Sequence, residues 1–266
     1  MNNSLRLFRW SATAWLLAYA FSILLLGDGA WASAPVQLAQ RSGVLQAVGE
    51  VLAALPQFLC TAMVCCLVVA VVLFLWKPHW SIGLLVWLLF RVISHRMWLA
   101  SNGGVQLMEN VLLWLALMHV RPGGAVSTMA FWSARLQLLL AYAAAAAHKF
   151  TGSAWLDGTA VGMVAADPLF NLGWLLHAPW LCTALTYAAL LWMTTFPLAM
   201  WWRGTRRWWL LIGVVFHLST AVFMGIPQMG LAFIACYAVW LDEREADRAV
   251  RWWRSLRHRK GAARTA

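Results

Sequence analysis

The sequence predicts an all-α fold: a polytopic transmembrane helical bundle with about eight spans and additional interfacial helices. Three observations carry this prediction. Of the 266 residues, 63% are hydrophobic and 11% are charged, and the mean hydropathy is +0.70. Soluble domains contain roughly 45–50% apolar and about 25% charged residues. The apolar residues also form long runs, and many of the 20 tryptophans lie at the ends of those runs, as expected at a membrane–water interface.

The first apolar run extends from Trp10 to about Leu26 and follows two arginines. A basic start and an apolar run also suit a secretory signal peptide, and Ala32-Ser33-Ala34 satisfies the small-x-small cleavage rule. We expect an uncleaved first span instead, because the run is near the length of a span and further spans follow. The amphipathic segment 36–54 is expected to lie along the membrane surface.

Seven more apolar runs follow, separated by polar or helix-breaking residues. Lys77-Pro78-His79 closes the second span, and Arg121-Pro122-Gly123-Gly124 ends the fourth. The fourth also carries Glu109, for which Arg91 or Arg135 is the expected partner in a structural ion pair. Residues 151–179 are too polar and too broken to cross. The eight expected spans are Trp10–Leu26, Pro56–Trp76, Trp80–His95, Val105–His119, Phe131–Phe150, Trp180–Trp202, Trp208–Met224 and Met229–Leu241.

The distribution of cations among the loops predicts which side of the membrane each end occupies. The loops fall into two alternating sets, one on each side of the membrane. One set holds most of the lysines and arginines, and the other set holds only three cations: Arg41, Arg96 and Lys149. The positive-inside rule places the cation-rich set in the cytoplasm. Both termini are then expected in the cytoplasm of a multi-pass protein of the cell membrane, and Lys149 is expected on the outer side.

Charge and cysteine content exclude several classes of function. Most of the +11 net charge belongs to the ends and short loops, so nucleic acid is not an expected partner. The five cysteines lie in apolar runs without metal-ligand spacing and are interpreted as small apolar side chains.

Residues 1–241 form one expected domain. Residues 242–266 form a basic tail that suits either an amphipathic helix on anionic lipid or a solvated anchor.

A polar seam runs along the apolar fifth span. Residues seven apart on a helix differ in direction by only about 20°, so Arg135, Tyr142 and Lys149 share one stripe. Gln137 and His148, eleven apart, share a second stripe. Polar groups in the low-dielectric interior of a membrane are costly and usually functional.

Lys149 and His217 are the strongest candidates for chemistry. Lys149 is the only lysine between Lys77 and Lys260, and a desolvated lysine, unlike arginine, can lose its proton. The alternative is a lysine that extends to the interface. His217 lies inside the seventh span, where it is either functional or bonded to a hydroxyl such as Ser219 or Thr220.

These residues resemble the HTTM family, a membrane domain shared with vitamin K-dependent gamma-carboxylase. The resemblance covers most of residues 100–241. One block comprises Arg135, Gln137, Tyr142, His148, Lys149, Gly152, Trp155, Asp157, Gly158 and Ala160; a second comprises His217, Ala221, Met224, Gly225 and Phe233; a third is Asn102-Gly103-Gly104. The lack of a large extramembrane portion makes the chain similar in architecture to stand-alone bacterial members such as sporulation-delaying protein B.

The resemblance implies a membrane enzyme of the bacterial inner membrane in which Lys149 is a base at the outer face. Tyr142, His148, His217 and Arg135 would complete the catalytic set, and Trp155, Asp157 and Gln137 would bind substrate. The implied substrate is a quinol, lipid or peptide, and a reduced quinone is the implied cofactor.

Two other functions remain open alongside the enzyme. One is a non-enzymatic maturation or immunity factor that holds a secreted hydrophobic peptide between its spans. The other is a transporter, which is less favoured because no pair of broken helices recurs in the two halves.

Overall fold

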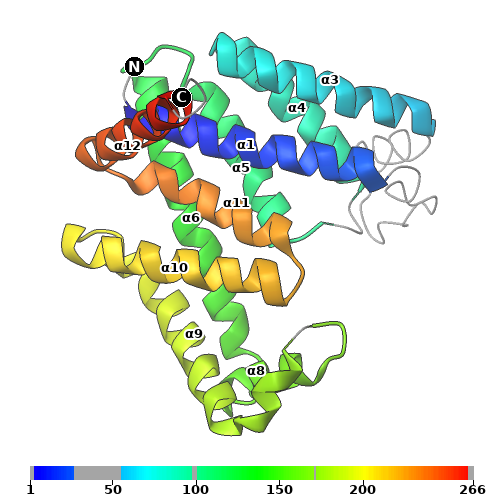
Figure 1. Ribbon diagram of the computed structural model, residues 1–266, viewed down its shortest axis with the longest axis vertical. Helices are drawn as coiled ribbons and strands as arrows, with labels where there is room; N and C mark the ends of the chain where they lie inside the picture. The colour runs from blue at the N-terminus through cyan, green and yellow to red at the C-terminus, as the bar shows by residue number, and fades with distance from the viewer. Residues whose placement is uncertain (1–2, 27–54, 98–100, 171, 263–266) are drawn as a thin grey trace.

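The computed structural model describes residues 3–26, 55–97, 101–170 and 172–262, and every regular element in these ranges is helical (Figure 1). The all-α prediction is therefore confirmed. The elements are α1 (Asn3–Leu26), α3 (Gln57–Trp76), α4 (Trp80–Arg96), α5 (Gly103–Leu117), α6 (Ala125–Phe150), α7 (Ser153–Leu156), α8 (Ala160–Ala166), η3 (Gly173–His177), α9 (Pro179–Ala199), α10 (Arg203–Phe223), α11 (Pro227–Tyr237), η4 (Ala238–Trp240) and α12 (Glu243–Ala262).

Three of these helices, α1, α3 and α9, are long and apolar enough to cross a membrane. Two further apolar helices, α5 and the continuous segment Pro227–Trp240, are shorter. Each of the eight expected spans coincides largely with a helix of the bundle. The expected surface segment 36–54 and the small-x-small site at 32–34 lie outside the described residues.

The long helices pack in two layers. Figure 1 shows α3, α1, α11 and α10 side by side, with α6 passing across them. In the rest of the bundle, α3 packs on α4, α4 on α5, α5 on α6, and α6 on α9. Helix α5 also packs on α11. This arrangement brings α6, α9, α10 and α11 around a common centre, which is where the polar residues of the seam matter.

Small residues allow the helices of the two layers to approach closely. A Cβ atom on Gly104 of α5 would lie 2.5 Å from Met229 Cα of α11. A Cβ on Gly230 of α11 would collide with the carbonyl oxygen of His217 on α10. The Asn102 side chain caps α5 by accepting hydrogen bonds from the amides of Gly104 and Val105, at 3.0 and 3.2 Å.

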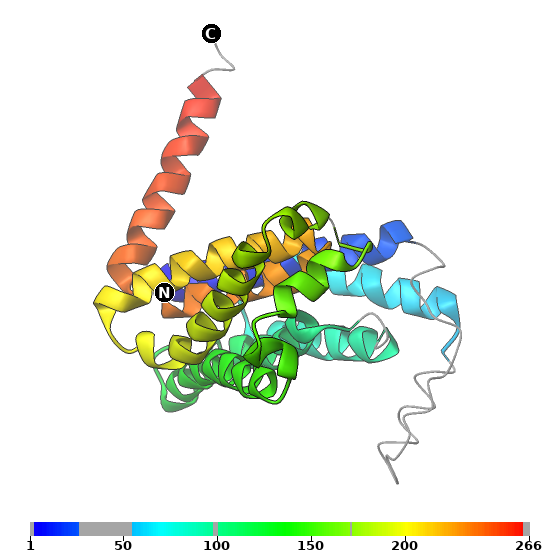
Figure 2. The same cartoon turned by 90° about the horizontal axis from the view of Figure 1, so that it is seen from below.

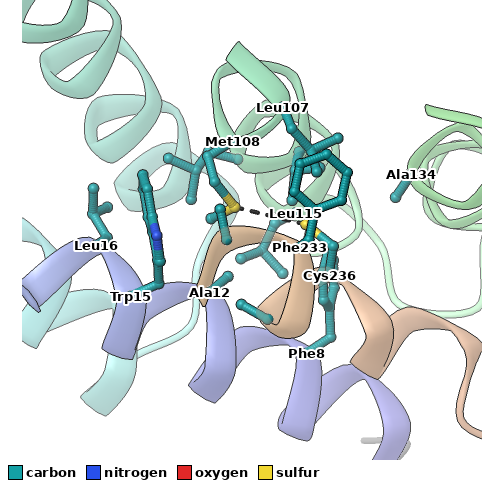
Figure 3. Packing of buried hydrophobic residues seen from close by; sticks show 14 of the residues in the cluster. Phe8, Ala12, Trp15, Leu16, Leu107, Met108, Leu115, Ala134, Phe233 and Cys236 are labelled. Atoms are coloured by element: carbon teal, nitrogen blue, oxygen red, sulfur yellow. Dashed lines mark hydrogen bonds between the residues drawn. The ribbon is translucent and has the colours of Figure 1, made fainter. Parts of the chain in front are cut away.

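The apolar core joins α1, α5 and α11 (Figure 3). Phe8 and Leu16 of α1 are fully buried, as is Met108 of α5. The sulfur of Cys236 on α11 lies 3.7 Å from the sulfur of Met108. Cys236 therefore packs as a small apolar side chain, as expected from the sequence, and α1 is an integral part of the core.

Glu109 forms its ion pair with Arg91, one of the two expected partners. Its other carboxylate oxygen accepts a hydrogen bond from the Ser94 hydroxyl at 2.6 Å. Glu109 therefore ties α5 to α4, and Arg135, the alternative partner, is engaged elsewhere.

The helix α12 is held at its first two turns and then leaves the bundle. Asp242 and Glu245 cap each other reciprocally: the Glu245 amide donates to the Asp242 carboxylate, and the Asp242 amide donates to Glu245, both at 2.9 Å. Figure 2 shows the rest of α12 extending away from the body of the protein.

Candidate functional site

Tyr142 of α6 lies at the centre of the bundle and is 1% exposed. Its hydroxyl oxygen is 2.6 Å from Nε2 of His217 on α10 and 2.6 Å from the hydroxyl of Tyr237 on α11. Three helices thus place three polar side chains in one continuous hydrogen-bonded chain, which we call the buried triad (Tyr142, His217 and Tyr237).

Aromatic rings surround the buried triad. The His217 ring stacks on Phe233, with centroids 4.6 Å apart and planes 11° apart. Phe196 and Trp192 of α9 cover the Tyr142 ring at centroid distances of 3.9 and 5.1 Å. Hydrogen bonds in such an apolar setting are strong when made and costly when lost.

The Tyr142 hydroxyl has one proton and two neighbours. It either donates to His217 and accepts from Tyr237, or donates to Tyr237 and accepts from protonated Nε2. The two arrangements keep both hydrogen bonds and differ in the tautomer of His217, whose Nε2 accepts in the first and donates in the second. The other ring nitrogen of His217, Nδ1, has no hydrogen-bond partner among the described residues.

Gly213, one turn before His217 on α10, makes room for Tyr237. A Cβ atom at this position would lie under 3.0 Å from the Tyr237 hydroxyl and from the Trp192 ring. Tyr237 was not among the candidate residues predicted from the sequence. The available signal was a lone tyrosine inside the last apolar run, together with a glycine at a helical position where alanine would be favoured.

Lys149 lies two turns beyond Tyr142, at the end of α6, and is half-buried. Its ammonium nitrogen is 4.7 Å from the centroid of the Trp155 ring, a cation–π contact. None of the ion pairs found among the described residues includes Lys149.

The structure does not place Lys149 beside Tyr142 and His217, with which the resemblance groups it in one catalytic set. The Tyr142 hydroxyl is already bonded to His217 and Tyr237, and His148 is exposed. Seven residues of helix separate Tyr142 from Lys149 by about 10 Å along the axis. Trp155 is the neighbour of Lys149 instead.

Arg135 belongs to a third location, in the first half of α6 and fourteen residues before Lys149. Fourteen residues correspond to about 21 Å of helix. The Arg135 Nε donates to the carbonyl oxygen of Val239 at 3.0 Å, and its guanidinium lies 4.9 Å from the Trp240 ring centroid and 4.4 Å from that of Phe131. Arg135 therefore fastens α6 to η4, and it cannot act on the same atoms as Lys149.

The three expected substrate-binding residues are also separated. Trp155 is beside Lys149, whereas Gln137, half-buried, lies about 18 Å away along α6. Asp157 is exposed, and its carboxylate accepts hydrogen bonds from the Thr159 hydroxyl and amide at 2.5 and 3.0 Å. These bonds hold the pKa of Asp157 below its ordinary value. Asp157 thus shapes the turn between α7 and α8.

Comparison of the chain with family models, with curated proteins and with solved structures finds no match. The described residues also contain no group of three or more His, Cys, Asp or Glu that could hold a metal ion. The described residues thus present two separate polar locations: the buried triad at the centre of the bundle, and Lys149 beside Trp155 at the end of α6.

Proposed function

We propose that this chain is a multi-pass membrane enzyme of the HTTM type, in which Lys149 removes a proton from a hydrophobic substrate at the outer face of a bacterial inner membrane. The observation that supports it best is the setting of Lys149, which is half-buried against the face of Trp155 and in no ion pair among the described residues. Partial burial without a carboxylate is the setting in which a lysine serves most readily as a base.

The buried triad supports the family assignment within this proposal. Tyr142 belongs to the first sequence block, and His217 and Phe233 belong to the second. Tyr142 and His217 are 75 residues apart in the chain and share a hydrogen bond, and Phe233 stacks on His217. Residues singled out for their resemblance to one family therefore meet at one point.

The proposal also includes a topology, in which the chain crosses the membrane eight times and both termini lie in the cytoplasm. The first turns of α12 contact both the start of α1 and the start of α10 at one end of the bundle. That end gathers Arg203, Arg206 and Arg207 with the basic tail, and Lys149 lies at the far end of α6. The positive-inside rule then assigns Lys149 to the outer side.

The substitution Lys149→Arg tests the base. Arginine keeps the charge and the contact with Trp155 but does not give up its proton near neutral pH. We expect purified wild-type protein in nanodiscs to bind menaquinol anaerobically and to convert it to the quinolate, seen by ultraviolet absorbance, and we expect Lys149→Arg to lose the quinolate signal.

Lys77→Arg is the matched control, because Lys77 is an exposed lysine in a loop on the other side. It should behave as wild type. A full quinolate signal in Lys149→Arg would contradict the role of Lys149, and no signal in wild type would exclude the quinol as substrate.

A second candidate function is a maturation or immunity factor that binds a secreted hydrophobic peptide without chemistry. The segment from α7 to the start of α9 exposes large apolar side chains, which favours this alternative: Leu156, Met163, Leu169, Trp174 and Trp180. It predicts that Trp174→Ala impairs function, that Lys149→Arg does not, and that a peptide co-purifies with the protein.

A further inference from the structure

The acidic residues of α12 all lie in its first turns, and they bind the bundle. The Glu243 carboxylate accepts hydrogen bonds from the backbone amides of Asn3 and Ser4, at 3.1 and 3.3 Å. These amides belong to the first turn of α1, where unpaired N–H groups favour an anion. The Asp247 carboxylate accepts a further hydrogen bond from the Asn3 side chain at 2.5 Å.

Arginines of α10 hold the same turns from the other side. The Arg207 Nε donates to Glu245 at 2.5 Å. Arg206, which is buried, lies 3.4 Å from Glu245 and 3.6 Å from Asp242. We call residues 242–247 with these partners the α12 clasp. The clasp uses every carboxylate of the tail.

Beyond the clasp, every acidic or basic side chain of α12 is a base. Residues 248–262 contain six lysines and arginines and no acid. Val250 is buried against the bundle, whereas Arg248, Arg251 and Trp252 are exposed. Every acid of the tail therefore lies in the clasp, and the sequence of the outer part of α12 carries net positive charge.

Three exposed tryptophans lie close in sequence to the arginines of the clasp. They are more than half exposed: Trp201 and Trp202 lie between α9 and α10, and Trp208 lies in the second turn of α10. In the sequence they flank Arg206 and Arg207. Such tryptophans mark the headgroup level of a membrane. Figure 2 shows α12 leaving this end across the direction of α1 and α10. Unlike α6, which also crosses α1 and α10, this part of α12 lies outside the body of the bundle, as a helix on a membrane surface does.

We propose that the outer part of α12, residues 248–262, lies on the membrane surface and binds anionic phospholipid headgroups. A basic helix with an adjacent tryptophan, fixed at headgroup level, matches the charge and the polarity gradient of an anionic leaflet. A soluble nucleic acid would need this charge to face away from the bilayer, and the clasp directs the helix along it. The assignment is independent of the role of Lys149.

Depth measurements with spin labels test this assignment on the full-length chain. A label is attached at Trp252→Cys or at Arg251→Cys in a variant without the five native cysteines, and the protein is placed in nanodiscs of phosphatidylcholine with or without phosphatidylglycerol. With phosphatidylglycerol, we expect the label at position 252 to collide at least threefold less with an aqueous nickel chelate than it does in neutral discs. The label at position 251 should remain accessible to the chelate, and high salt should abolish the difference between the discs.

A charge-neutralised variant supplies the second arm. Arg254→Gln, Arg257→Gln and Arg259→Gln together should remove the effect of phosphatidylglycerol. The matched control, Lys77→Gln with Arg121→Gln and Arg203→Gln, removes three exposed cations outside α12 and should leave the effect intact. Equal chelate access in both kinds of disc would overturn the proposal. Protection by soluble heparin in neutral discs, without protection by phosphatidylglycerol, would reassign the helix to a soluble polyanion.

Discussion

The Tyr142 hydroxyl occupies the middle of the buried triad, so its removal affects two partners at once. Tyr142→Phe leaves His217 Nε2 and the Tyr237 hydroxyl without the partner they have now. Each buried polar group left unpaired costs about 1–3 kcal/mol. Tyr237→Phe removes one bond only and leaves Tyr142 bonded to His217.

We therefore expect Tyr142→Phe to lower the thermal unfolding midpoint in detergent more than Tyr237→Phe does. The double variant should be less destabilised than the sum of the two single variants, because both substitutions remove the same bond between the tyrosines. Equal effects of the single variants, or strict additivity, would show that the buried triad is not a connected unit.

Gly213 gives a steric prediction at the same place. Gly213→Ala puts a methyl group against the Tyr237 hydroxyl and the Trp192 ring, and overpacking of a core costs about 1–3 kcal/mol. Gly204→Ala is the matched control on the same helix, because nothing lies within 4 Å of its added Cβ. We expect Gly213→Ala to destabilise the protein in a thermal unfolding assay, whereas Gly204→Ala should be neutral or stabilising. Similar midpoints for the two variants would contradict the packing around Tyr237.

At the scale of single helices, the sequence predicted which side of a helix a residue lies on better than which neighbours it contacts along the axis. The seven-residue spacing of Arg135, Tyr142 and Lys149 correctly indicates one stripe, but residues on one stripe are still separated along the axis by about 1.5 Å each. Tyr142 therefore joins the buried triad, Lys149 contacts Trp155, and Arg135 contacts Trp240. Tertiary packing determines which helices face each part of the stripe, and the sequence of α6 alone does not contain that information.

The carboxylates of the α12 clasp predict that the docking of α12 on the bundle depends on pH. The amide of Glu245 and then the nearby Arg206 lower the pKa of the Asp242 carboxyl from its ordinary value of 3.8. A carboxyl whose pKa is lowered by folding stabilises the folded form above its unfolded pKa, and that stabilisation is lost as the pH falls through the folded pKa. The docking of α12 should therefore hold at pH 5 and above and weaken below about pH 4.

The mobility of a spin label at position 251 between pH 6 and pH 3 measures this docking. Asp242→Asn should loosen α12 at pH 6 and flatten part of the pH response, whereas Asp167→Asn, a matched substitution in the loop between α8 and η3, should not. A label that stays immobile to pH 3 in the wild type would contradict the prediction.

At the scale of the whole molecule, composition and run lengths predicted the class of the fold and the location of most helices. Runs of apolar residues fix where the backbone must satisfy its own hydrogen bonds, and that requirement produces helices. The lateral order of the helices depends on close contacts such as that between Gly230 and His217. A single sequence does not show which glycines face which neighbours, and it did not reveal Tyr237 for the same reason.

The α12 clasp also has a consequence for the order in which the protein is assembled. The first turn of α1 makes its hydrogen bonds with Glu243 and Asp247, and Trp15 donates to the carbonyl oxygen of Gln228. These partners are synthesised more than 200 residues after α1, and synthesis proceeds at about 5–20 residues per second. Helix α1 thus waits for about ten seconds or longer before these neighbours exist. Throughout that interval the surface of α1 that packs on α11 and α12 lacks its final neighbours, whereas the surface that packs on α3 gains its partner much earlier.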